Sequence, residues 1–388
     1  MENQIKENNS SVLIVDDEKA ILSSLRSLFR KEGYQIFLAS SGSEALTVLV
    51  DNKIDIIICD MKMPEMTGVQ FLEKSVVASP GSLRIILSGY EDRNVVMAAL
   101  TNGLAHIFLL KPWSDGYLKE IVKRQAILSR KIHKINLKDT LSKINKLPMM
   151  PNLKGKINAI MGSEYISTEK LKAEVEQNPA IVAKLLQVAN SVYLGSWNRV
   201  KSVSEAIQFL GTSYVISLIA GCEVFDEFYK YLTNGSRIFL DELFRQSLEK
   251  AVIAKKVAEG YPELNKDILF LSCMFLDIGL IVRILTEQEE FKKYETQRDS
   301  FPSFYEAEKV FFGVTHDFIS EALLEMWNFP KEIIEIVANH HIIGNDQPYI
   351  EVAQIVDSLV CGKCKYPYNP NIIEKAAEWK SKLQIKND

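Results

Sequence analysis

Three aspartates, a serine and a lysine stand where their side chains could together carry out phosphoryl chemistry. Asp16 and Asp17 end one short apolar run, Asp60 follows a second, and Ser88 and Lys111 follow two more. Clustered carboxylates repel one another unless a cation lies among them, and Mg²⁺ typically joins one or two carboxylates to a phosphate. With the ion bound, an aspartate can form an acyl phosphate, whose oxygens a lysine and a serine would neutralise and hydrogen-bond. This chemistry requires a fold that brings the five residues together.

The elements around these residues alternate between strand-like and helical patterns. Five apolar runs predict strands at Val12–Asp16, Gln35–Ala39, Ile54–Cys59, Arg84–Leu87 and His106–Leu110. Apolar residues at helical spacing lie between them and predict helices at Lys19–Lys31, from a Ser43 cap to Val50, at Val69–Ala78 and at Asn94–Leu100. Strands separated by helices pair in parallel, because antiparallel hairpins need no crossover helix. The N-terminal third is therefore predicted to be a doubly wound α/β domain with a five-stranded parallel sheet.

Ligands of such a sheet bind beyond the carboxyl ends of its strands, where the strand order reverses. The acid pair, Asp60, Ser88 and Lys111 all stand at those ends, so one rim of the sheet is expected to carry them all. An unrelated α/β core could hold any one of these residues by chance. The ordered set on four strand ends favours a functional site.

This set resembles the receiver domains of bacterial response regulators, which have a flavodoxin-like fold. The family's elements occur in order: the acid pair, then Asp60 in DMKMPEMTG, then Ser88, then Lys111-Pro112. The resemblance implies that Asp60 is the phosphoacceptor and that Ser88 and Lys111 bind the phosphoryl group. It implies that Mg²⁺ is held by Asp17 directly, by Asp16 chiefly through water, by Asp60 and by the backbone carbonyl of Lys62. It also makes Phe108 the switch aromatic and a cis Lys111–Pro112 bond an expectation.

The segment Asp115 to Ile135 is predicted to be one helix joining the receiver, residues 1–124, to the rest through a linker at 125–140. Its seam is spaced alternately by four and three residues, as in a coiled coil: Ile121, Gln125, Leu128, Ile132 and Ile135. The seam is short, so two interpretations remain open. The helix could pair with a second copy in a homodimer, or it could be the last receiver helix, packed on its own sheet.

Residues 141–388 are predicted to form an all-α domain with a C-terminal extension. Helical spacing dominates there, with two helices meeting at Asn178-Pro179 and one long apolar helix at Ile268–Leu285. Several strings are similar to the HDOD domain, a relative of the HD metal-dependent phosphohydrolases; they are LPMMPNL, NPAIVAKLLQVANSVYLG, SVSEAIQFLG, FLDIG, FGVTH and NHH. The resemblance extends from about Leu141 to Val360.

HD chemistry needs His and Asp side chains around one or two metals that activate water against a phosphoester. Here Leu276-Asp277 stands where those enzymes carry a His-Asp pair, and Gln246 stands where they carry an earlier helical His. Because an alkyl group and an amide replace two imidazoles, the resemblance implies a scaffold rather than a hydrolase. The remaining candidates for a metal cluster of HD type are Asp277, His316, His340, His341 and Asp357; the alternative is that they are buried polar residues satisfied by helix ends.

Composition limits the remaining classes. The net charge of −4 and the absence of a basic block argue against a nucleic-acid partner. The N-terminus lacks the pattern of a secretory signal, and five cysteines without a dense framework are typical of a reducing cytoplasm. Asp277 and Arg283 interrupt the apolar run that is long enough to span a membrane, which favours a buried helix and no membrane contact.

The sequence therefore predicts a cytoplasmic response regulator that is phosphorylated by a sensor histidine kinase. Its non-catalytic HDOD domain would pass the signal to a protein partner that the sequence does not identify. The alternatives are a receiver-controlled, metal-dependent phosphodiesterase with a degenerate site, and a phosphate sink that only drains a kinase.

Overall fold

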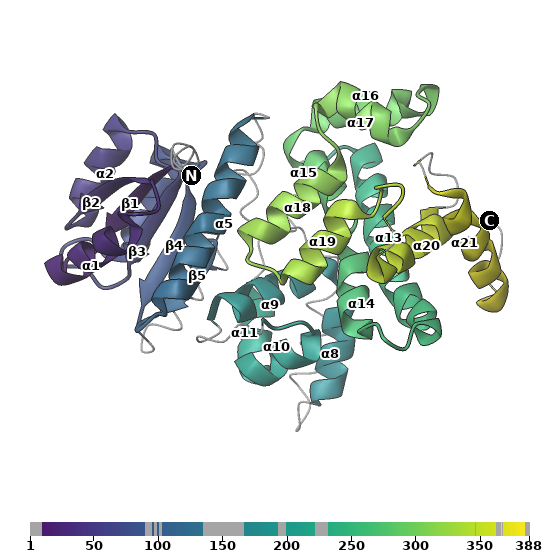
Figure 1. Ribbon diagram of the computed structural model, residues 1–388, viewed down its shortest axis with the longest axis horizontal. Helices are drawn as coiled ribbons and strands as arrows, with labels where there is room; N and C mark the ends of the chain where they lie inside the picture. Colours follow the sequence, from purple (N-terminus) through teal and green to yellow (C-terminus); the bar gives the residue numbers. More distant parts are fainter. Residues whose placement is uncertain are drawn as a thin grey trace. The chain divides into compact units, whose positions relative to one another are not determined.

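The computed structural model describes residues 10–89, 95–96, 99–100, 103–134, 167–192, 199–221, 232–345, 347–361, 366 and 368–384. Contacts among these residues divide the chain into two compact units. One is built around a sheet in the N-terminal part of the chain, and the other is built from helices (Figure 1). The predicted fold class, α/β followed by all-α, is confirmed.

The sheet of the N-terminal unit has five parallel strands in the order β2-β1-β3-β4-β5. They are β1 (Ser11–Val15), β2 (Gln35–Ala39), β3 (Ile56–Asp60), β4 (Leu83–Ser88) and β5 (Ile107–Leu110). The strand order reverses at β1, which pairs with β2 on one side and β3 on the other. Every residue of β1, β3 and β4 is buried, as expected of parallel strands covered by helices. All five predicted strands are present.

The helices of this unit begin close to where the sequence places them. They are α1 (Lys19–Phe29), α2 (Gly42–Asp51) and α3 (Gly68–Ala78). The cap of α2 differs from the prediction: Ser41, rather than Ser43, accepts a hydrogen bond from the Glu44 backbone N–H. Thr67 caps α3 through a capping box with Gln70. The helix predicted at Asn94–Leu100 lies mostly outside the described residues, although 95–96 and 99–100 are helical.

The long helix α5 (Asp115–Lys134) matches the predicted linker helix. It packs against α1 and β3 of its own unit, and the Ser129 hydroxyl donates a 2.9 Å hydrogen bond to Asp55 Oδ1. Ile121, Gln125 and the seam residues up to Ile132 are buried, whereas the seam position Ile135 lies outside the described residues. The interpretation as the last receiver helix therefore fits α5, and dimerisation through it stays a prediction.

The second unit is mainly helical in its described residues, although residues 187–192 and 325–326, which end two of the helices below, belong to the first unit. Its α-helices are α8 (Thr168–Glu176), α9 (Pro179–Val192), α10 (Val203–Leu210), α11 (Thr212–Gly221), α13 (Asn234–Val257), α14 (Lys266–Phe275), α15 (Ile278–Thr286), α16 (Gln288–Gln297), α17 (Phe304–Phe312), α18 (His316–Met326), α19 (Lys331–Asn339), α20 (Pro348–Cys361) and α21 (Pro370–Lys382). The predicted break at Asn178-Pro179 separates α8 from α9. The LPMMPNL string, at 147–153, lies outside the described residues.

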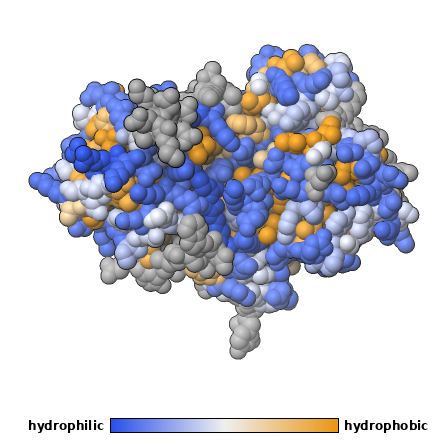
Figure 2. Space-filling view, viewed as in Figure 1, coloured by the Kyte–Doolittle hydropathy of each residue, from blue (hydrophilic) through white to orange (hydrophobic). Residues whose placement is uncertain are grey.

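The predicted single helix at Ile268–Leu285 is wrong, because two helices, α14 and α15, meet at Leu276 and Asp277. Among the described residues, Lys266–Thr286 is the segment long and apolar enough to be a candidate membrane span, and 94% of its most apolar window is buried inside the protein. The two helices are core elements of the second unit: α14 packs against α13, α19 and α20. Figure 2 shows hydrophobic residues in several separate patches on a largely hydrophilic surface, and the exposed hydrophobic side chains of this unit include Val310 of α17, at 67% exposure.

Candidate functional site

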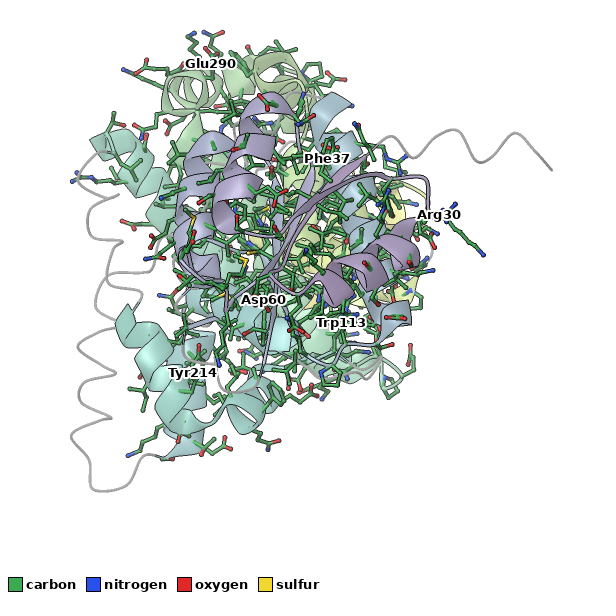
Figure 3. All side chains as sticks on the ribbon, turned by 90° about the vertical axis from the view of Figure 1, so that its left-hand side faces the viewer. Arg30, Phe37, Asp60, Trp113, Tyr214 and Glu290 are labelled. Atoms are coloured by element: carbon green, nitrogen blue, oxygen red, sulfur yellow. The ribbon has the colours of Figure 1, made fainter. Side chains whose placement is uncertain are left out.

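The carboxyl ends of three strands bring two acids and a lysine into direct contact. Asp60 is the last residue of β3, Asp16 follows β1 and Lys111 follows β5. The Lys111 ammonium lies 2.5 Å from Asp60 Oδ1 and 3.1 Å from Asp16 Oδ2, so one cation joins both carboxylates. Asp60 is labelled in Figure 3, which faces this unit of the chain. The sheet thus unites Asp16, Asp60 and Lys111 at one rim, as predicted.

Burial and charge pairing act in opposite directions on these groups. Burial raises the pKa of Asp16, although the Glu18 backbone N–H and the Lys111 ammonium both lower it. Burial alone would lower the pKa of Lys111, but its hydrogen bonds to Asp60 and Asp16 raise it overall. Lys111 is therefore a charged ammonium at neutral pH, and it faces the carboxylate that is the candidate nucleophile.

The other predicted members of the site lie on or beside strands of the same sheet. The Lys62 backbone N–H donates a 2.8 Å hydrogen bond to Asp60 Oδ2. Ser88 ends the neighbouring strand β4 and is buried, whereas Asp17 is exposed. Phe108 is fully buried on β5, paired in register with Ile86 of β4. The Lys111–Pro112 peptide bond is cis, as the resemblance implies.

The donor atoms at this rim fit a hard, oxygen-seeking cation such as Mg²⁺. Asp16 and Asp60 supply carboxylate oxygens from adjacent strands, and Asp17 adds a carboxylate that solvent can reach. Mg²⁺ keeps several waters when it binds proteins, so an exposed acid beside two buried ones suits it. An ammonium already partly balances the two buried acids, which is compatible with a metal that comes and goes.

Gly68 packs closely against the backbone of Asp60 and Met61, and replacing it tests whether this packing holds the site in place. A Cβ at this position would lie 2.2 Å from the Asp60 carbonyl oxygen and 2.8 Å from Met61 Cα, both backbone atoms that cannot turn aside. We expect Gly68→Ala to destabilise the domain by roughly 1–3 kcal/mol through overpacking and to slow phosphoryl uptake. Gly116→Ala is the matched control, because its nearest contact is 3.9 Å away. Thermal denaturation of both variants checks this, and equal melting temperatures would contradict it.

The second unit contains a buried charge cluster centred on Lys250 of α13. The Lys250 ammonium forms ion pairs with Asp277, which precedes α15, and with Asp357 of α20. All three side chains are at most 5% exposed. Tyr368 donates a hydrogen bond to Asp357 Oδ2. Burial would lower the pKa of Lys250, but the two carboxylates raise it well above its ordinary value.

Three histidines adjoin this cluster, and their hydrogen bonds fix their roles. His316 Nδ1 lies 2.9 Å from the buried Glu308 carboxylate. Burial would lower the pKa of His316, but the charge of Glu308 and the hydrogen bond to it outweigh burial and raise this pKa to about 9. Its Nε2 lies 3.5 Å from Asp277 Oδ1 and 3.3 Å from His340 Nε2. His340 Nδ1 lies 2.7 Å from the Val337 carbonyl oxygen and donates to it, which leaves Nε2 as an acceptor.

His341 has no hydrogen-bond partner for either ring nitrogen within the described part of the chain. Burial holds its pKa well below the usual range, so the ring is neutral. Tyr366 stacks on it with ring centroids 4.3 Å apart and donates a hydrogen bond to Glu308. The structure therefore brings together the five predicted candidates. Each of the three histidines offers one ring nitrogen as a possible metal ligand, and these three nitrogens lie within 4.8 Å of one another.

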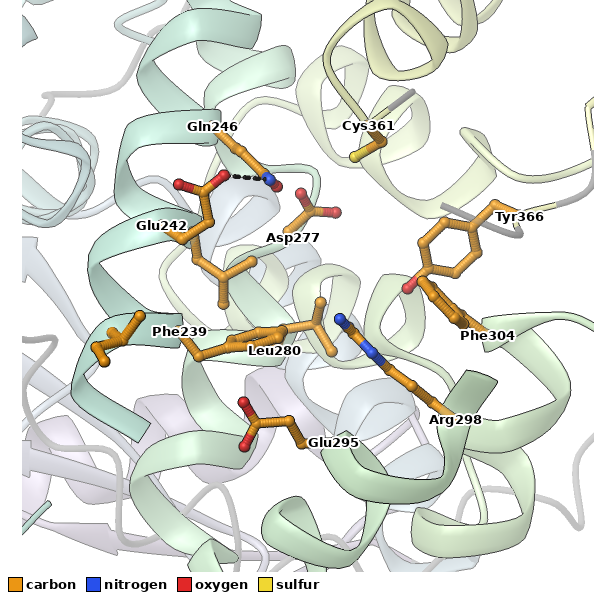
Figure 4. Close-up of a pocket in the computed structure, with 12 residues that line it drawn as sticks. Phe239, Glu242, Gln246, Asp277, Leu280, Glu295, Arg298, Phe304, Cys361 and Tyr366 are labelled. Atoms are coloured by element: carbon orange, nitrogen blue, oxygen red, sulfur yellow. Dashed lines mark hydrogen bonds between the residues drawn. The ribbon is translucent and has the colours of Figure 1, made fainter. Parts of the chain in front are cut away.

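Gln246, which the resemblance places in the position of an HD ligand, borders a cavity of about 220 Å³ (Figure 4). Its amide donates to Glu242 Oε1 at 2.8 Å, and Asp277, Arg298 and Tyr366 also line the cavity. The apolar side chain of Leu276, which precedes Asp277, is fully buried. Neither residue offers the imidazole that an HD enzyme carries.

Sequence reasoning missed Lys250, Glu308, Tyr366 and Tyr368. A signal for Lys250 exists: it lies on the buried stripe of α13, whose members are spaced alternately by four and three and are Leu243, Ser247, Lys250, Ala254 and Val257. A lysine on such a stripe must find acids inside the protein. The sequence offers no comparable signal for Glu308 or for the two tyrosines, because tertiary contacts alone bring them to the cluster.

Models of two known protein families match the two parts of the chain. The model of the HDOD domain matches residues 147–343, and that of the response regulator receiver domain matches residues 12–123. The fold and the rim of the sheet define a receiver domain of two-component signalling. The chain belongs to the HDOD family and carries that receiver at its N-terminal end.

Two of the curated relatives each match about a third of the chain. Sporulation initiation phosphotransferase F of Bacillus subtilis is 32% identical over 116 residues, which are 30% of this chain and 93% of that protein. The hydrogenase transcriptional regulatory protein HoxA of Cupriavidus necator is 32% identical over 137 residues, 34% of this chain and 28% of that protein. The chain thus spans less than a third of HoxA. A solved receiver domain protein of Clostridium thermocellum is 30% identical, with a TM-score of 0.30, over 32% of this chain and 98% of that chain.

Proposed function

We propose that the protein is a two-component response regulator that accepts a phosphoryl group on Asp60 and signals through a non-catalytic HDOD domain. The observation that carries this proposal is the Lys111 ammonium, 2.5 Å from Asp60 Oδ1, at the carboxyl end of a parallel sheet. A sensor histidine kinase would be the donor, and the cytoplasm would be its compartment. The downstream partner would be a protein bound by the HDOD domain.

The residues of the rim divide the work as follows. Asp60 Oδ1 or Oδ2 attacks the phosphorus of the kinase's phosphohistidine, the P–N bond breaks and the histidine leaves, and Lys111 neutralises the phosphoryl oxygens that arrive beside it. The Ser88 hydroxyl, at the end of the adjacent strand, hydrogen-bonds a phosphoryl oxygen. Asp16, Asp17, Asp60 and the Lys62 carbonyl would hold Mg²⁺, which supplies positive charge to the phosphoryl group when bound. Phe108, on the strand beside Ser88, would transmit the change.

The HDOD half of the proposal rests on its altered donor set. Leu276 and Gln246 supply no imidazole at two positions where HD enzymes have one, and Gln246 is engaged with Glu242. The alternative, a receiver-regulated metal-dependent phosphodiesterase, draws on the three buried histidines. Turnover of cyclic dinucleotides that is lost in His316→Ala would favour that alternative.

A test of signalling compares the full chain with and without a phosphoryl mimic, such as beryllium trifluoride with Mg²⁺. Hydrogen–deuterium exchange should change first around β4 and β5, because Ser88 and Phe108 lie there, and then in peptides of the HDOD domain. Asp60→Asn is the control and should show neither change. A response confined to the receiver would contradict signalling through the HDOD domain and would favour a phosphate sink.

A further inference from the structure

The buried stripe of α13 carries a full positive charge into the centre of the HDOD domain. Lys250 is completely inaccessible to solvent, and its neighbours on the stripe are small or apolar. A buried lysine is strongly disfavoured unless acids compensate it. The burial of the Lys250 ammonium therefore requires a structural explanation.

The two acids that compensate Lys250 are arranged as ligands of a cation. Asp277 Oδ2 and Asp357 Oδ1 both bind the ammonium, although α15 and α20 bring them from distant parts of the sequence. Donor atoms of Asp277, Asp357 and Cys361 all lie within 4.8 Å of one another, close enough to surround one metal ion. The remaining oxygen of Asp357 accepts from Tyr368, and that of Asp277 faces His316. The only cation that the described residues place between the two carboxylates is the lysine itself.

We propose that Lys250 is the resident cation of this centre, a tethered ammonium that takes the place of a metal ion between Asp277 and Asp357. A metal of HD type does not fit this pair of acids, because the ammonium occupies the space between them and, unlike the partly exposed Lys111, is fully enclosed and cannot move aside into solvent. Unlike a metal, the ammonium cannot dissociate and cannot activate a water molecule. The centre is then a permanent structural junction of α13, α15 and α20.

The neighbouring groups support this arrangement. His316 uses Nδ1 for Glu308 and faces Asp277 with Nε2, so it adds a second positive group on the far side of that acid. Among the described residues, no histidine hydrogen-bonds Asp357, whose partners there are Lys250, Tyr368 and Cys361. Removal of the ammonium should leave two adjacent carboxylates that a divalent ion could bridge.

Three variants of the full-length chain test the proposal. Lys250→Ser leaves room for an ion, Lys250→Arg keeps the charge, and Lys250→Ser/Asp357→Asn removes one of the ligands. Each is stripped with chelator and dialysed against Mn²⁺ or Zn²⁺, and bound metal is measured by elemental mass spectrometry. We expect Lys250→Ser to hold about one more equivalent of metal than the wild type. Neither of the other two variants should show that gain.

Thermal denaturation supplies an independent readout. The melting temperature of Lys250→Ser should rise on addition of Mn²⁺ or Zn²⁺ and fall again with EDTA, whereas Lys250→Arg and the wild type should respond much less. Equal metal content in Lys250→Ser and the wild type, without rescue by metal, would overturn the proposal.

The wild type decides the question even if Lys250→Ser fails to fold. Metal in the wild type that a folded Asp357→Asn variant lacks, with folding checked by its helical circular dichroism, would mean that the pair binds an ion despite the lysine, and the proposal would fail. Metal content that Asp357→Asn leaves unchanged supports it. The receiver rim with Asp60 is the same in every variant, so any metal it binds cancels in the comparison; failure here leaves the proposed signalling function intact, and failure of phosphorylation leaves this inference intact.

Discussion

Asp60→Asn is expected to abolish phosphoryl incorporation from acetyl phosphate and Mg²⁺, whereas the wild type should gain one phosphoryl group. The amide keeps the size of the side chain and can still accept from the Lys62 backbone N–H, so the loop should remain in place. It lacks the carboxylate charge that attacks phosphorus and that holds the Lys111 ammonium. Intact-mass spectrometry measures the result directly.

The matched control for this variant is Asp51→Asn at the exposed end of α2, which should incorporate as well as the wild type. Chelation of Mg²⁺ with EDTA should stop incorporation in the wild type without unfolding it. Continued incorporation in Asp60→Asn would move the acceptor to another acid of the rim. No incorporation in any form would mean that the rim is only structural.

The rim of the receiver could be predicted from the sequence because its information is local. Each functional residue follows a strand whose apolar run is plain, and the carboxyl ends of parallel strands necessarily meet at one edge. The sequence pattern alone therefore predicts that Asp16, Asp60 and Lys111 lie together, as they do in the structure. The hydrogen bond to the Lys62 backbone and the close packing of Gly68 were not predictable, because both depend on the path of one loop.

The helical half was less predictable because its decisive features are breaks and long-range contacts. The α14–α15 break contains no proline or glycine at Leu276 and Asp277, so the apolar run looked continuous. The start of α15 is closely packed, because a Cβ on Gly279 would lie 2.1 Å from the His316 carbonyl oxygen. Ser320 also bridges this junction, accepting from the Gly279 N–H and donating to the Leu276 carbonyl.

Helices without a long apolar stripe have only a weak signal in the sequence. The helix α16 is largely polar, with Phe291 and Tyr294 as its buried residues, and α21 buries only Ile372 and Ala376. Their helical state depends on packing against α17 and α20, which a window of sequence does not contain. The HDOD motif strings, by contrast, were found without any knowledge of the packing that they produce.

The buried charge cluster leads to the second large expected effect, on stability. Asp357→Asn alone should destabilise the HDOD domain by about 3–5 kcal/mol, because it leaves a buried ammonium with one acid instead of two. Lys250→Met alone should cost a similar amount, since two buried carboxylates would then face each other. The double variant Lys250→Met/Asp357→Asn should be less destabilised than the sum, and less than Lys250→Met alone. The acid that remains, Asp277, still has His316 3.5 Å away.

Urea denaturation of the full chain measures these differences as shifts in the midpoint of the HDOD transition. Trp379 reports on this domain from α21, while Trp113 belongs to the receiver, so the two transitions are distinguishable in backgrounds that keep one of these tryptophans and replace the other three by Phe. Lys256→Met is the matched control, because this lysine is exposed on the same helix and should shift the midpoint little. Strict additivity of the two single substitutions would mean that Lys250 and Asp357 do not depend on each other. A double variant that is more stable than Lys250→Met alone would establish that the acids hold the charge of Lys250 in place. Loss of packing volume alone could not make a second substitution restore stability.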